Sequence, residues 1–277
     1  MNINVTPAAS RGQPQFRHAQ EGVQYELFCG DTFFSVRIIE TTSAQFNGIW
    51  MYEGGKARGL MSNYEKLTRA ATPHVDLSGD SLRIEIEEAG GTIHAKTDEG
   101  PFDLTFESPI TFVWGIPPTA ANSATHQPLL NVTVKFAGRE YKGIGYCKRY
   151  WHSDIDYCFW RFISGPVQRN GETAYLWTAE ANFDLKKYDY FKLATPDGKL
   201  RVAGPNDSRH RELEAFGVLD GIKCHASVRH LGNWEYLIRK NNTDLKIIQA
   251  FCELTYEEGG KIYKGHALHE IGAGTYR

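Results

Sequence analysis

The chain has 277 residues, of which 41% are hydrophobic and 23% are charged, and its formal net charge at pH 7 is −2. This weakly acidic balance gives no electrostatic reason to expect binding to nucleic acid or to an anionic membrane surface. No run approaches the roughly 20 apolar residues that cross a bilayer as a helix, so we expect no membrane span.

The cysteines and the N-terminal residues indicate a compartment. Five cysteines are scattered along the chain, odd in number and without C-x-x-C spacing. This pattern indicates free, mostly buried thiols in a reducing environment. The first residues lack the apolar stretch of a secretory signal. We therefore expect a cytoplasmic protein in which residues 1–22 form a disordered segment.

The predicted elements are short β-strands. In residues 81–88, Leu82, Ile84 and Ile86 fall on one face and charged residues fall on the other, at period two. Ala89-Gly90-Gly91 predicts a turn, after which residues 92–97 return as the partner strand. Further β-branched or aromatic runs, bounded by Gly, Pro or Asn, lie at residues 103–114, 131–138, 156–165 and 173–183.

The C-terminal part predicts an antiparallel meander. Residues 233–240, 245–256 and 261–271 have strand composition, and turn residues lie between them at 241–244 and 257–260. Only residues 208–217 have a helical pattern, with Asp207 or Ser208 as the cap. Many short strands at hairpin spacing are typical of β-barrels and β-sandwiches.

A short motif occurs twice in this context. Tyr-Lys-Gly begins at Tyr141 and again at Tyr263, and each copy stands near the end of a series of predicted strands. Residues 23–150 and 151–277 are each about as long as one small up-and-down barrel. We interpret the motif as the mark of one architecture that is built twice.

Residues 132–167 resemble the middle of the tandem lipocalin-like proteins. The shared pattern is a strand, Gly-Tyr, a polar cluster, Trp151, a strand that carries Trp160, and a Gly turn. Residues 263–274 similarly resemble the end of the second barrel in that superfamily, which includes AttH-like, carotenoid hydratase-like, kievitone hydratase-like and fungal Diels–Alderase-like proteins. The resemblance implies an all-β fold of two lipocalin-like antiparallel β-barrels in tandem, packed together.

The chain departs from the carotenoid hydratases in the polar cluster. Where those proteins have approximately Asp-His-Asn-Trp, this chain has Lys148, Arg149, Tyr150 and Trp151. An arginine does not release its proton near neutral pH, so it cannot be the general acid of a water addition. It can hold a carboxylate or polarise a carbonyl.

The composition suits an aromatic binding pocket. The chain has fifteen Phe, fourteen Tyr and six Trp, and a barrel or a pair of barrels can enclose a pocket that water enters poorly. Such a pocket can fold a flexible chain toward a reactive geometry and so lower the entropic part of the barrier. No cofactor is expected. The pattern leaves open whether the pocket lies within one barrel or between two.

The candidate site residues follow from the resemblance and from strand alternation. The catalytic candidates are Arg149, Tyr146 and His269, the last because histidine titrates near neutrality. The candidates for substrate binding are Trp151, Trp160, Tyr175, Trp177, Glu180 and Glu253. For Arg149, Glu180 and Glu253 the alternative is an ordinary solvated side chain, and most of the aromatic residues could equally be core.

Other chemistries have weak support in the sequence. His266 and His269 are three residues apart, which on a strand turns them to opposite faces, and His225 and His230 lack a third ligand nearby. We expect no metal site. There is no Gly-x-Ser-x-Gly elbow, Walker loop or dinucleotide fingerprint. Cys147 is expected to be a structural thiol.

Two functions of different class remain. The first is a cofactor-independent enzyme of specialised metabolism that cyclises, pericyclic reactions included, or isomerises a hydrophobic polyene, terpenoid or polyketide, with a hydratase or dehydratase as its variant. The second is a non-catalytic carrier of hydrophobic small molecules. The resemblance favours the enzyme, because the tandem form is most often enzymatic. The partner expected in either case is a hydrophobic small molecule.

Overall fold

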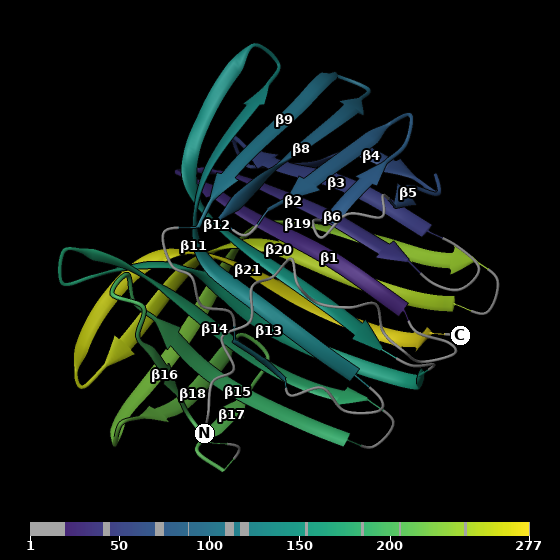
Figure 1. The fold of residues 1–277 in the computed structure, drawn as a ribbon. Coiled ribbons are helices and arrows are strands. Elements are labelled where there is room, and N and C mark those ends of the chain that lie inside the picture. The colour runs from purple at the N-terminus through teal and green to yellow at the C-terminus, as the bar shows by residue number, and fades with distance from the viewer. Residues whose placement is uncertain are drawn as a thin grey trace. The chain divides into compact units, whose positions relative to one another are not determined.

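The computed structural model describes residues 20–40, 45–69, 75–87, 89–108, 114–116, 122–152, 155–183, 186–204, 206–240 and 243–276. The secondary-structure elements of these residues are all β-strands (Figure 1). The described residues contain no helix that is long and apolar enough to cross a membrane. The chain divides into two compact units, the first ending at Asp154 and the second beginning at Ile155. The prediction of an all-β protein is confirmed.

The first unit is one curled antiparallel sheet. Within the described residues it has twelve strands, in the order β4-β3-β2-β1-β12-β11-β9-β8-β7-β6-β5, and β10 also pairs with β11. The strands are β1 (Gln20–Cys29), β2 (Thr32–Glu40), β3 (Gln45–Glu53), β4 (Lys56–Asn63), β5 (Thr68–Arg69), β6 (Val75–Ser78), β7 (Leu82–Ile86), β8 (Gly90–Thr97), β9 (Gly100–Glu107), β10 (Trp114–Ile116), β11 (Asn122–Phe136) and β12 (Arg139–His152). The curl brings β4 to the β8–β9 turn, where the amide of Asp98 donates to the carbonyl of Leu60 at 3.3 Å. β1 begins inside the segment 1–22 that was predicted to be disordered.

The second unit repeats this plan with nine strands among its described residues, in the order β16-β15-β14-β13-β21-β20-β19-β18-β17. The strands are β13 (Ile155–Arg169), β14 (Glu172–Phe183), β15 (Lys186–Ala194), β16 (Leu200–Val202), β17 (Ser208–His210), β18 (Glu214–Leu219), β19 (Ile222–Lys240), β20 (Thr243–Glu258) and β21 (Lys261–Tyr276). The guanidinium of Arg161 on β13 donates to the carbonyl of His210 on β17 at 3.2 Å, so this sheet also curls on itself. The predicted C-terminal meander is confirmed as β19, β20 and β21.

The predicted repeat has a structural counterpart. In each unit the last strand, β12 or β21, pairs with the first strand, β1 or β13. The glycine of each Tyr-Lys-Gly lies where the closing strand approaches the first strand most closely. A Cβ at Gly143 would overlap the carbonyl oxygen of Phe28, and a Cβ at Gly265 would overlap that of Pro166. The same backbone contact therefore requires glycine in both copies.

Tight two-residue turns join many of these strands. Asn170-Gly171 and Gly259-Gly260 have positive φ at both positions, with values of 52° and 84° and of 57° and 80°. Two consecutive positive φ angles match the right-handed twist of paired strands. The turn predicted at residues 257–260 is confirmed on this basis.

The helix predicted over residues 208–217 is wrong. The segment forms β17 and β18 instead, and the side chains of β18 alternate between buried and half-buried at period two. Ala215 enters the core, whereas Phe216 stacks on His225 of the neighbouring strand with ring centroids 4.6 Å apart. Strand pairing of β18 with β19 outweighed the local helical preference of these residues.

The second unit has two distinct faces. Its core face carries the apolar cluster inside the curl, which includes Ile163, Leu176, Phe191, Ala250 and Tyr256. Its second face is the opposite side of the same strands. Because side chains alternate, odd-numbered residues of β13 and even-numbered residues of β14 lie on the core face, and their neighbours lie on the second face.

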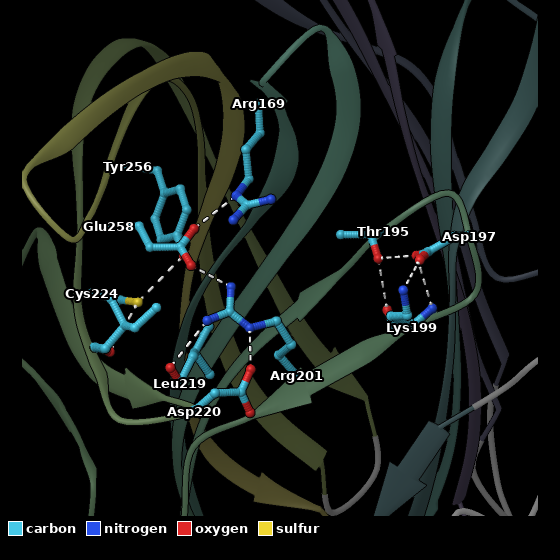
Figure 2. Close-up of polar contacts among 11 residues, drawn as sticks. Arg169, Thr195, Asp197, Lys199, Arg201, Leu219, Asp220, Cys224, Tyr256 and Glu258 are labelled. Atoms are coloured by element: carbon cyan, nitrogen blue, oxygen red, sulfur yellow. Dashed lines mark hydrogen bonds and ion pairs between the residues drawn. The ribbon is translucent and has the colours of Figure 1, made fainter.

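One end of the core face is closed by ion pairs (Figure 2). The carboxylate of Glu258 lies between the guanidinium groups of Arg169 and Arg201, and Arg201 also reaches Asp220 at 2.6 Å. Burial alone would raise the pKa of Glu258, but hydrogen bonds from the two arginines hold it below its usual value. Beneath this group the hydroxyl of Tyr256 donates to the thiol of Cys224 at 3.4 Å. We interpret the ion pairs and the hydrogen bond at this end of the unit as structural contacts that hold its strands together.

Candidate functional site

The second face of the second unit gathers aromatic, acidic and basic side chains by register alone. Its strands align three rows of side chains, read across the sheet from β15 to β20 or β19. The Lys192 row is Lys192, Trp177, Ser164, Leu268 and Phe251. The Glu270 row is Tyr190, Ala179, Phe162, Glu270, Gln249 and Trp234. The Trp160 row is Tyr188, Ala181, Trp160, Gly272, Ile247 and Tyr236.

Glu270 is a fully buried carboxylate in the middle row. The indole N–H of Trp160 donates to its Oε1 at 2.7 Å, and the amide of Gln249 donates to its Oε2. Gln249 is itself oriented by the indole N–H of Trp234, which donates to its Oε1 at 2.9 Å. One bond to each oxygen fixes the orientation of the carboxylate.

Lys192 is the buried base of the first row. Its side chain is 4% exposed, and its Nζ lies 4.6 Å from the ring centroid of Tyr190 and 5.2 Å from that of Trp177. Burial lowers the pKa of Lys192 from 10.5 to about 7. An amine in this range can give or take a proton near neutral pH.

Aromatic rings surround these two groups. Tyr188 and Tyr190 stack with centroids 6.4 Å apart, and Phe183 links Tyr188 to Trp160. A Cβ at Gly272 would overlap the indole of Trp160, so the glycine allows this ring to lie against β21. The result is an apolar face with a carboxylate and an amine set into it.

A hydroxyl pair completes the first row. The hydroxyls of Ser164 and Tyr175 are 2.8 Å apart, and both side chains are fully buried. Either hydroxyl can be the donor in this bond, so the other hydroxyl is able to donate its own proton to a polar group on the second face.

The arrangement can do two kinds of chemistry. The aromatic rings can bind a flat or extended hydrophobic molecule and stabilise positive charge that develops on it. The oriented carboxylate can accept a proton or stabilise a cation, and the amine can polarise a carbonyl or exchange a proton.

The structure divides the predicted residues of this unit between its faces. Trp160, Tyr175 and Trp177 come together on the second face, as the register shows. His269 and Glu180 lie on the core face, beside Ile163 and Arg161 respectively. The two sets therefore do not form one site within the sheet.

Glu253 lies on the same strand as Gln249 but at the exposed surface. Its carboxylate pairs with Arg229 at 2.6 Å, and its side chain is 51% exposed. The hydrogen bond from Arg229 lowers the pKa of Glu253. A solvated surface pair accounts for this residue.

The remaining predicted residues belong to the first unit. Tyr146 is fully buried on β12, and its hydroxyl contacts Nδ1 of His126. Arg149 and Trp151 continue the same strand, opposite Val23 and Glu21 of β1. The side chains of Arg149 and Trp151 lie outside the part of the chain that the structure describes.

Sequence reasoning missed Lys192 and underrated Gln249, Trp234 and Glu270. Each residue lies in a strand with clear alternation of side chains. Their place on one face near one another depends on which residues of six strands are opposite one another. The only local signal was a lysine directly after the aromatic run 188–191 and a glutamate in the closing strand.

No constellation of metal ligands accompanies this face. Over the described ranges, no group of three or more His, Cys, Asp or Glu side chains is arranged to hold a metal ion. The chemistry derived above uses the chain's own side chains.

Comparison with solved structures shows the fold. Kievitone hydratase from Nectria haematococca is 10% identical with a TM-score of 0.64, over 96% of this chain and 92% of that one. An AttH protein from Nitrosomonas europaea is 14% identical with a TM-score of 0.57, over 94% and 93%. CghA bound to Sch210972 is 11% identical with a TM-score of 0.51, over 98% and 95%. No protein-family model matches the sequence, and no curated protein matches it. The expected tandem lipocalin-like fold is confirmed, and this fold is shared with enzymes.

Proposed function

We propose that the protein is a cofactor-independent enzyme that cyclises or isomerises a hydrophobic polyene, terpenoid or polyketide on the second face of its second unit. The observation that carries the proposal is Glu270, a buried carboxylate oriented by Trp160 and Gln249 within an aromatic face. A buried ionisable group on an apolar face costs stability, and such groups concentrate at functional sites.

The spacing of the two ionisable groups suits an extended substrate. Lys192 on β15 and Glu270 on β21 are separated by two intervening strands, which places the strand axes about 14 Å apart. Aromatic side chains lie in both of their rows and in the neighbouring Trp160 row. A molecule of polyene length could contact both groups at once while its apolar body covers the rings.

Each group has a distinct role in this proposal. Lys192, when protonated, donates to a carbonyl of the substrate and draws electron density toward it. Glu270 accepts a proton released from the substrate, or stabilises the positive charge that forms during ring closure. The aromatic rings hold the chain in the folded conformation that the reaction requires.

Hydration or dehydration is the second candidate. Kievitone hydratase gives the highest TM-score of the three structures, 0.64, and a buried carboxylate is also a suitable base for activating water. The cyclase remains the first choice because the two groups lie on an aromatic face, which favours reactions of the substrate with itself.

The test is incubation of the protein with a lipophilic extract of its source cells, followed by chromatography and mass spectrometry. The wild type is compared with Glu270→Gln and with Glu257→Gln, a matched change on the exposed side of β20. The proposal predicts a product of unchanged mass that requires Glu270, with turnover falling about 100-fold or more in Glu270→Gln and staying at the wild-type level in Glu257→Gln.

The outcomes separate the candidates. A product heavier or lighter by one water would establish the hydratase variant. A compound that binds stoichiometrically and is recovered unchanged would show a carrier and would overturn the enzyme. Turnover that survives in Glu270→Gln would move the chemistry away from the second face.

A further inference from the structure

The core face of the second unit carries a separate polar cluster at the end opposite Glu258. It lies where β13 begins and β14 ends, and it draws on six different strands. We define the core-end cluster as Arg161, Thr178, Glu180, Asn182, Lys187, Asp189, His210, His230 and His269. None of these residues belongs to the three rows of the second face.

The charged members of the core-end cluster neutralise one another. Arg161 donates to Glu180 from Nε at 2.7 Å, and Lys187 bridges Glu180 and Asp189 at 3.5 and 3.2 Å. Burial would raise the pKa of Glu180, but the hydrogen bond from Arg161 holds it below its usual value. Two cations and two carboxylates therefore balance, and this network offers no net charge to a ligand.

Three polar atoms of the cluster are left over. Oγ1 of Thr178, Oδ1 of Asn182 and Nε2 of His210 are buried and have no hydrogen-bond partner among the described residues. Thr178 and Asn182 flank Glu180 on the core face of β14, and Asp189, which contacts His210, is opposite Glu180. All three residues therefore neighbour the Glu180–Asp189 pair, Thr178 and Asn182 on either side of Glu180 along β14 and His210 beside Asp189. Buried polar atoms without partners are rare, and each calls for an occupant.

The chemistry of His210 indicates what the occupant is. Its side chain is 2% exposed, and its Nδ1 lies 3.4 Å from Oδ1 of Asp189. Burial lowers the pKa of His210, so the ring is neutral and carries one N–H. Since Nδ1 donates to Asp189, Nε2 is an acceptor. Oδ1 of Asn182 is also an acceptor, so the unpartnered atoms of the cluster are two acceptors and one hydroxyl.

Apolar side chains border the same region. Ile163 on β13 and Ile271 on β21 are core-face neighbours of His269 and Arg161, and Ile271 is only half-buried. Phe159, the next core-face residue of β13, is also half-buried. An occupant therefore meets hydrogen-bond acceptors on one side and hydrocarbon on the other.

We propose that the core-end cluster is a second small-molecule site, distinct from the second face, which binds the hydroxyl of a phenol or a comparable ring alcohol through Nε2 of His210. The hydroxyl donates to His210, and Thr178 is placed to donate to the same oxygen. The ring lies against Phe159 and Ile271. The proposal does not depend on the reaction proposed above.

The test uses p-cresol and toluene, which differ by one hydroxyl. Imidazole ¹³C–¹H NMR signals of the labelled full-length protein are followed during titration with each compound, and the His210 signal is identified with His210→Phe. We expect p-cresol to shift the His210 signal saturably and toluene to leave it in place. Thr178→Val, which keeps the shape of the side chain, should weaken p-cresol binding several-fold. His94→Phe, a change at the exposed surface of the first unit, should leave it unchanged.

The result can overturn the proposal even if His210→Phe fails to fold, because both titrations are made on the wild-type protein and Thr178→Val provides a second variant. Equal shifts with p-cresol and toluene would show an apolar site without recognition of the hydroxyl. No shift of any imidazole signal up to the solubility limit of p-cresol would show that ordered water, not a ligand, satisfies the three atoms.

Discussion

At the scale of single residues, the burial of Lys192 costs stability. Its pKa falls from 10.5 to about 7 because the ammonium is buried. While the unfolded lysine is protonated, folding must either bury the charged ammonium or release its proton, and both oppose folding. The cost is full at and below pH 7, shrinks as pH rises toward 10.5, and is absent above it.

Lys192→Met should therefore stabilise the protein while abolishing its activity. At pH 7 we expect the free energy of unfolding to rise by about 2–4 kcal/mol, with a smaller gain at pH 9, as measured by chemical denaturation. Lys223→Met, a change at an exposed position of β19, should alter stability by less than about 0.5 kcal/mol. A destabilised Lys192→Met protein would contradict this reading of the burial.

His269 is expected to make the stability of the protein depend on pH in the acidic range. Burial, reinforced by neighbouring His230 and Arg161, lowers the pKa of His269 from 6.5 to about 4, and its Nδ1 lies 2.9 Å from Nε2 of His230. The unfolded chain takes up the proton first as pH falls. Stability is therefore complete above about pH 6.5 and is lost progressively toward pH 4.

His269→Gln should flatten this acid dependence. Denaturation curves between pH 6.5 and 4 should show a loss of stability smaller than that of the wild type by about 1–3 kcal/mol. His225→Gln, a change on β19, serves as the control and should keep the wild-type slope. An unchanged slope in His269→Gln would mean that other groups carry the acid sensitivity.

At the scale of elements, the closing strands show how far a sequence motif can be interpreted. The two Tyr-Lys-Gly copies correctly marked equivalent strands, β12 and β21. Their physical reason, a backbone approach that excludes a Cβ, depends on the partner strand and was not visible in the motif. Residues 208–217 show the converse, since a locally helical pattern gave way to pairing with β19.

The closing strands also give a stability prediction. Gly265→Ala places a methyl group against the carbonyl of Pro166, and we expect it to lower the free energy of unfolding by about 1–3 kcal/mol. Gly59→Ala on β4 is the matched control, because its nearest neighbours are side-chain atoms of Trp50 at 3.7 Å. It should change stability by less than about 0.5 kcal/mol. Equal effects in the two variants would show that the close approach is not what requires glycine.

At the scale of the whole molecule, strand content, repeat and resemblance together predicted the all-β fold, and the comparisons confirm that the chain shares the tandem lipocalin-like fold. The candidate site was predicted only in part. Trp160, Tyr175 and Trp177, which were predicted from the sequence, lie on one face of the sheet, but Lys192 entered only when the register placed it opposite Trp177. Glu180 and His269 were grouped with them because alternation gives the face within a strand, not the match of faces across strands.

The central claim is that the second face of the second unit binds a substrate and converts it. Native mass spectrometry of the wild type and of Glu270→Gln, after incubation with the same lipophilic extract, tests it most directly. The account predicts that Glu270→Gln retains the compound that the wild type consumes, and that the wild type releases an isomer of equal mass. If both proteins hold the same unchanged compound, the face is a carrier surface and the enzymatic account is wrong.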